Sequence, residues 1–181
     1  MSKSSKDAGA IISLVAGPLA MVLILVAFIL QMATPGIHIS GTFLIWNVSN
    51  DIDGVKIIFG SSDPKAVLSW SALIAWIFFI LTFAVLAALL VFDIIKFAGV
   101  EKAAKKMNMD AAKLLLIIRL AVAVLLIVAA IFIFIAVPTF ASANDASTNG
   151  LSLNAGWIIA GILAILAAIA VPLPSLLSLK K

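Results

Sequence analysis

Residues 70–92 read WSALIAWIFFILTFAVLAALLVF and contain no charged side chain. A helix of about 23 residues, rising about 1.5 Å per residue, is long enough to cross a hydrocarbon layer of about 30 Å. Three further long apolar stretches lie at residues 10–32, 114–137 and 155–177. The sequence therefore predicts an all-α integral membrane protein, a bundle of four transmembrane helices.

The composition agrees with this fold class. Of the 181 residues, 65% are hydrophobic and 11% are charged, whereas a soluble domain is about half apolar and about a quarter charged. The four spans occupy about half of a chain whose length suits one domain. We therefore expect a single membrane domain, residues 1–181, with no separate soluble domain.

Capping residues indicate where the helices begin and end. Asp63 can accept hydrogen bonds from the free amides of a following helix, and Pro64 suits the first helical position. Asp110 can cap the third helix in the same way. We expect helices at about 10–32, 64–98, 111–137 and 155–177, outer loops at 34–63 and 139–154, and a cytoplasmic loop at 99–110.

The basic residues predict the orientation. If the N-terminus is cytoplasmic, ten of the twelve Lys and Arg residues lie in or beside the cytoplasmic segments, and only Lys56 and Lys65 lie outside. Cytoplasmic segments of membrane proteins carry such an excess of Lys and Arg. The sequence thus predicts a multi-pass protein of the cell membrane with both termini inside. The chain has a net charge of +4. Because the basic residues are placed as membrane topology requires, we expect no nucleic-acid partner.

The first outer loop has the composition of a β-hairpin. Residues 42–48 and 55–59 are β-branched and aromatic runs, separated by a turn-forming segment at 49–54. Trp46 and Phe59 are candidate interaction residues, because aromatic rings favour the membrane interface. An isolated hairpin is marginally stable in water, so this one should lie on the helix ends or pair with another strand.

The fourth span presents small residues on one side. Such a face allows close approach of another helix, which is how helices associate in lipid. The candidate interaction residues on this face are Gly156, Ala160, Gly161 and Ala164.

Asp93 and Arg119 are the charged residues closest to the middle of the membrane. In a helical hairpin that turns near Lys105 and Lys106, both lie about 13 residues from the turn and so at equal depth. They are a candidate intramembrane ion pair. Two interpretations remain open: a structural pair, or part of a proton or ion pathway.

The residue inventory argues against catalysis. Cysteine is absent and His38 is the single histidine, so neither a thiolate site nor a zinc site is expected, and no Ser, His and acid group can assemble within the membrane. Asp51 and Asp53 fit a turn better than a calcium loop, and Asn47-Val48-Ser49 is a formal glycosylation sequon. We expect no enzyme activity, no metal and no cofactor.

Cytoplasmic termini, a larger first outer loop with strands and Trp46, and a smaller second loop together resemble the topology of claudins and related tetraspan proteins. The resemblance covers topology alone, since the Gly-Leu-Trp and paired-cysteine signature of claudins is missing.

The sequence thus predicts a non-catalytic tetraspan membrane protein that works through helix and outer-loop contacts, as a self-associating scaffold or an accessory subunit of a membrane complex. Its partners would be membrane lipids and further copies or other membrane-protein subunits. The alternative is a small oligomeric channel or transporter subunit.

Overall fold

The structure, a computed structural model, describes residues 3–43, 46–62, 65–97 and 109–179. It is mostly helical, and four helical segments are long and apolar enough to cross a membrane, as the sequence predicted. They are Val15–Ala33, Trp70–Ile94, Lys113–Phe134 and Ala155–Leu176. These four segments indicate a membrane-embedded protein.

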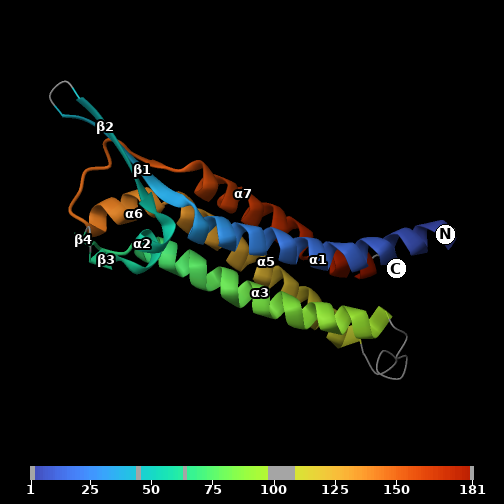
Figure 1. Ribbon diagram of the computed structural model, residues 1–181. Coiled ribbons are helices and arrows are strands. Elements are labelled where there is room, and N and C mark those ends of the chain that lie inside the picture. Colours follow the sequence, from blue (N-terminus) through green and yellow to red (C-terminus); the bar gives the residue numbers. More distant parts are fainter. Residues whose placement is uncertain (1–2, 44–45, 63–64, 98–108, 180–181) are drawn as a thin grey trace.

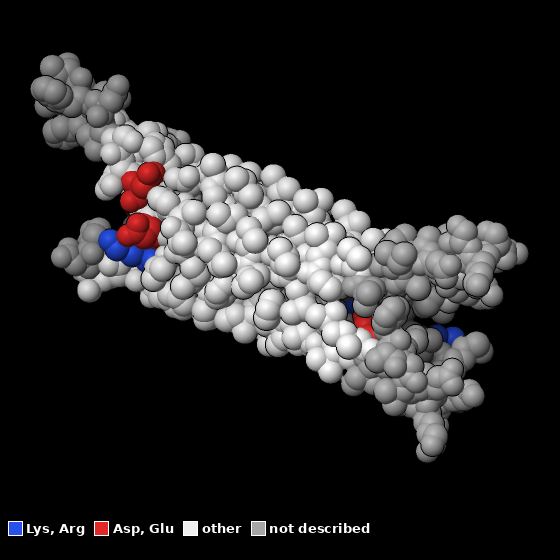
Figure 2. All heavy atoms as spheres, turned by 45° about the vertical axis from the view of Figure 1, so that its right-hand side comes forward, with Lys and Arg blue, Asp and Glu red and all other residues white. Residues whose placement is uncertain are grey.

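The four segments belong to α1 (Lys3–Ala33), α3 (Trp70–Phe97), α5 (Met109–Phe134), and the pair α7 (Ala155–Ala170) and α8 (Leu173–Leu179). They lie side by side, with both chain ends at one end and a small sheet at the other (Figure 1). Figure 2 shows that coloured charged groups gather near the two ends of this face and leave a white belt between them. An uncharged belt of this kind matches the hydrocarbon layer of a bilayer.

Helix α7 packs against α1 and α5, and α3 packs against the same two helices. After Trp157 in its first turn, the buried side of α7 is made of small residues: Ala160, Gly161, Ala164, Ala167, Ala168 and Ala170. Its opposite side exposes large ones: Ile158, Ile159, Ile162, Ile165, Leu166 and Ile169. Small residues let helix backbones approach closely, so dispersion contacts and not water exclusion hold the helices together in lipid.

The second span begins later than the sequence predicted. Helix α3 starts at Trp70 and not at Pro64, and Lys65–Ala66 forms the short strand β4, which pairs with β3 (Ser61–Ser62). The capping residue is Ser69, whose hydroxyl accepts from the backbone N–H of Ala72 at 3.5 Å. The helix start predicted at Asp63-Pro64 was wrong, since this dipeptide is also typical of turns; the two residues themselves lie outside the described ranges.

The hairpin exists, but its strands differ from those predicted. They are β1 (Pro35–Phe43) and β2 (Trp46–Asp53), and the predicted second strand, residues 55–59, lies in the short helix α2 (Gly54–Phe59). A short apolar run does not by itself distinguish a buried helix from a strand. Here Ile57 and Ile58 are both fully buried, which a helical turn allows and an alternating strand facing water would not.

The later boundaries also shift. Helix α6 (Ala136–Ala143) follows α5, so residues 139–143 are helical and not part of the second outer loop. Pro138 is tolerated because it lies in the first turn, where no helical donor is needed. The fourth span divides into α7 and α8 near Pro172, and β5 (Leu151–Leu153) lies in the second outer loop. Most of the predicted cytoplasmic loop, 99–110, lies outside the described residues.

The packing of α7 is open to a direct test. Ala164 is fully buried, so Ala164→Leu should overpack the site and lower the free energy of unfolding by about 1–3 kcal/mol, measured by denaturant titration in mixed micelles. The control is Ile165→Leu at the neighbouring position, which is 39% exposed and should change stability by less than about 0.5 kcal/mol. Equal stability of the two variants would contradict the packing described.

Candidate interaction surface: the outer sheet and its junction

The sheet at the end of the helices opposite the two chain ends has three antiparallel strands in the order β2-β1-β5 (Figure 1). Strand β1 follows α1 after a single residue, Thr34. It pairs along its length with β2, but with β5 only at Ile37, His38 and Ile39. The hairpin therefore extends past the third strand, and it projects beyond the helix ends (Figure 1).

Hydrogen bonds fix the base of this sheet to the helices. The indole N–H of Trp157 in α7 donates to the backbone carbonyl of Gln31 in α1 at 3.1 Å. The side-chain amide of Gln31 donates to the carbonyl of Ala72 in α3 at 3.2 Å, and the N–H of Asn154 donates to the carbonyl of Gly36 at 2.9 Å. Three spans and the sheet thus meet at one level.

Two glycines permit this close junction. A Cβ atom on Gly36 would overlap the side chains of Ile57 and Trp157, and one on Gly156 would overlap the side chain of Thr34. Gly156 was predicted from the small-residue pattern of the fourth span, and it packs here within the chain.

A cluster of buried hydroxyl groups ties α3 to α6 near the same junction. The hydroxyl oxygen of Thr139 lies 2.6 Å from that of Ser69 and 2.7 Å from that of Ser71. Thr139 also donates to the carbonyls of Ile135 and Ala136, each at 3.0 Å. These carbonyls lie where α5 gives way to α6, and the hydroxyl bonds there in addition to the backbone, since the Ile135 carbonyl also accepts the Thr139 N–H at 3.2 Å.

The backbone groups on the far edge of β2 face away from the sheet. The N–H of Ser40 donates to the carbonyl of Gly150 at 2.7 Å, toward β5. Since backbone groups alternate across an antiparallel strand, those of Ser49, opposite Ser40 in the register, point away from β1, as do those of Asn47 and Asp51. The side chain of Asn50 accepts from the N–H of Asp51 at 2.9 Å, so this edge is partly protected.

One face of the hairpin is polar and carries a connected set of side chains. His38 Nδ1 lies 2.7 Å from Asp51 Oδ1, and His38 Nε2 lies 3.4 Å from Ser49 Oγ. Asn154 Nδ2 donates to Asp51 Oδ1 at 3.5 Å. The sequence analysis missed this group, because its predicted turn included Ser49 and Asp51 and so separated them from His38. The alternation of Ile37, His38, Ile39 and Ser40 was the available signal.

Several predicted interaction residues lie elsewhere. Trp46 opens β2 opposite Phe43, and its side chain lies outside the described part of the chain. Phe59 is in α2, is 46% exposed, and meets Trp76 edge to face at 5.1 Å between ring centres. Ala160 and Ala164 are fully buried within the helices, so the small-residue face is occupied by the chain's own α1 and α5.

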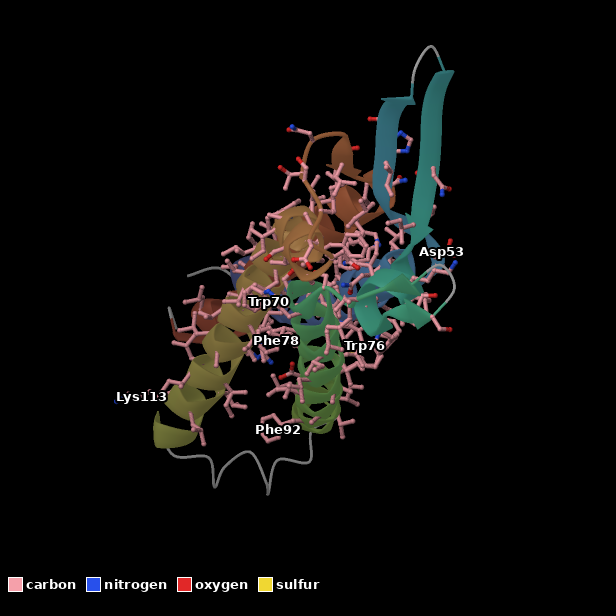
Figure 3. The ribbon with its side chains drawn as sticks, turned by 90° about the vertical axis from the view of Figure 1, so that its left-hand side faces the viewer. Asp53, Trp70, Trp76, Phe78, Phe92 and Lys113 are labelled. Carbon is pink, nitrogen blue, oxygen red and sulfur yellow. The ribbon has the colours of Figure 1, made fainter. Side chains whose placement is uncertain are left out.

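At the opposite end, the structure brings Asp93 and Arg119 together. Arg119 Nη2 donates to Asp93 Oδ2 at 2.5 Å. The side chain of Arg119 is 5% exposed and that of Asp93 is 19% exposed. Arg119 Nε has no partner among the described residues. Trp70 lies at the sheet end of α3 and Phe92 toward the opposite end, on the side where Lys113 begins the span in α5 (Figure 3). The pair joins α3 to α5 with its charges neutralised.

An apolar cavity of about 310 Å³ lies between α1 and α3. Its lining includes Ile24, Phe28, Phe79 and Phe83.

Within the described ranges no three His, Asp or Glu side chains come close enough to hold a metal ion. Asp53, part of the possible calcium turn, instead lies 3.6 Å from Lys56 Nζ.

Comparison with known proteins adds no relative: no family model, curated protein or solved structure matches this chain.

The ion pair predicts a specific pattern of stability. Asp93→Asn leaves the nearly buried Arg119 without its carboxylate and should lower the free energy of unfolding by about 1–3 kcal/mol. The double variant Asp93→Asn/Arg119→Gln should recover part of this loss, because no unpaired charge remains. A double-mutant cycle in micelles measures the coupling, and strictly additive losses would show that the two groups do not act as a pair.

Proposed function

We propose that this chain spans the cell membrane four times, with both termini in the cytoplasm, and works through protein contacts as a self-associating scaffold or an accessory subunit of a membrane complex. Its partners are membrane lipids and further copies or other membrane-protein subunits. The membrane-spanning part is non-catalytic in this proposal, and the outer sheet is its contact surface.

The observation that carries the proposal is a sheet with an open edge, β2, whose base is hydrogen-bonded to the helices. Backbone groups of Asn47 and Ser49 face outward on the β2 edge, and an open edge is a template for another strand. The bonds from Trp157 and Gln31 hold the base of the sheet against three spans. A contact surface held in one geometry loses less entropy on binding.

The packing of α7 supports this choice of surface. Because its small-residue face is buried within the chain, that face is not free for a partner helix. The large side chains exposed on the helices are mostly Ile, Leu and Val, which suit hydrocarbon as well as protein. The outer sheet, with its unpaired backbone hydrogen-bonding groups on β2, therefore offers a partner more specific contacts than the helices do.

The alternative, a channel or transporter subunit, has less support. The charge of Arg119 is met by Asp93, and the hydroxyl of Thr82 donates to the carbonyls of Phe78 and Phe79 in its own helix. Arg119 Nη2 and the Thr82 hydroxyl thus bond inside the chain, whereas a pathway needs polar groups that face a passing ion.

Edge pairing is tested with two variants at one position. Asn47→Pro removes an outward-facing N–H and should abolish strand pairing, while an edge strand tolerates proline. Asn47→Ala keeps the N–H and is the control. We expect chemical crosslinking and native mass spectrometry in lipid nanodiscs to show oligomers or a bound subunit with the wild type and Asn47→Ala, and their loss with Asn47→Pro. A wild-type monomer without a reproducible partner would overturn the proposal.

Orientation is tested with single cysteines, which the natural sequence lacks. Ser152 in β5 is exposed at the sheet end, and Lys181 is the last residue. A membrane-impermeant maleimide added to intact cells should label Ser152→Cys and should label Lys181→Cys only after permeabilisation. The reverse pattern would place the termini outside, against the distribution of lysines.

A further inference from the structure

On the polar face of the hairpin, the side chain of His38 lies between those of Asp51 and Ser49. Asp51 meets His38 at Nδ1, and Ser49 meets the same ring at Nε2, at 2.7 and 3.4 Å. A carboxylate on one ring nitrogen and a hydroxyl on the other is the arrangement in which a serine becomes a nucleophile. All three lie on adjacent antiparallel strands, with His38 directly opposite Asp51.

The carboxylate selects the useful tautomer. Asp51 is an acceptor, so Nδ1 of a neutral His38 carries the proton and Nε2 presents its lone pair to the Ser49 hydroxyl. Asn154 donates to the same oxygen of Asp51 at 3.5 Å. Because Asn154 immediately precedes α7, this contact positions the carboxylate from the helix side.

Ser49 is accessible to a reactant. Its side chain is exposed, and its own backbone N–H faces the open edge of β2, as the alternation from Ser40 requires. The N–H of a nucleophilic serine is a donor that can stabilise the oxyanion of acyl transfer. A nucleophile, a base, a residue that orients the base, and an oxyanion donor thus lie within one short segment.

We propose that Ser49, with His38 as general base and Asp51 as the positioning residue, is an acyl-transfer site on the outer hairpin that accepts small, accessible carboxylic esters. Ser49 Oγ attacks the carbonyl carbon while its proton passes to His38 Nε2. The ester C–O bond then breaks, and the alcohol leaves with that proton. The reaction uses the unpaired β2 edge, because a strand paired there would occupy the Ser49 N–H.

Water completes the reaction. It attacks the acyl carbon while giving a proton to His38 Nε2, the bond to Ser49 Oγ breaks, and Oγ takes the proton back. The sum is ester plus water giving acid plus alcohol, with no other reactant. The open surface around Ser49 favours small esters, since burial against an acyl chain is not available there.

The test is covalent labelling of the full-length chain in nanodiscs. A fluorophosphonate probe should react at Ser49, forming an O–P bond and releasing fluoride, and the site is located by mass spectrometry. Ser49→Ala should abolish labelling. Ser40→Ala is the matched control: Ser40 lies opposite Ser49 on β1, its hydroxyl donates to Gly150, and labelling should persist in that variant.

Two variants test the roles. His38→Gln should lower the labelling rate, and the hydrolysis rate of p-nitrophenyl acetate, by about 10²–10⁴-fold, the usual contribution of a general base. Asp51→Asn should slow labelling but leave its final extent unchanged, whereas an unfolded hairpin would lower the extent. Failure of the wild type to react, or labelling that survives in Ser49→Ala, would overturn the proposal while leaving the crosslinking result untouched.

Discussion

The last carbonyl groups of α1 impose the main constraint on this fold. A helix leaves its final carbonyls without partners, and an unpaired backbone group near hydrocarbon costs several kcal/mol. Here the indole of Trp157 donates to the carbonyl of Gln31, and the Gln31 side chain donates to α3. The bonds at the C-terminal end of α1 therefore also align α1 with α3 and α7. Strand β1 begins directly after this level, at Pro35.

The parts of the fold that sequence predicted depend on local properties. The length and apolarity of a stretch do not depend on its neighbours, and the structure contains four helical segments long and apolar enough to cross a membrane, as predicted. Asp93 and Arg119 were placed at equal depth by counting residues, because the helical rise is uniform. The structure brings these two side chains together.

The parts that sequence did not predict depend on competition between similar signals. Asp63 and Ser69 both look like helix caps, and burial of Ser69 against Thr139 favours the second. Residues 54–59 are apolar enough for a strand or a helix, and contact with the spans decides in favour of α2. A displaced turn changes every cross-strand pair, which is why His38 and Asp51 were not recognised as neighbours.

The direct passage from α1 into β1 has a mechanical consequence. Only Thr34 separates the helix from the strand, and the Thr34 carbonyl itself accepts the N–H of Gly54 at 3.2 Å. No flexible linker therefore separates α1 from β1. A force applied to the hairpin is therefore transmitted along β1 into the axis of α1, and through the Trp157 bond into α7, so that tension on the sheet loads these two helices directly.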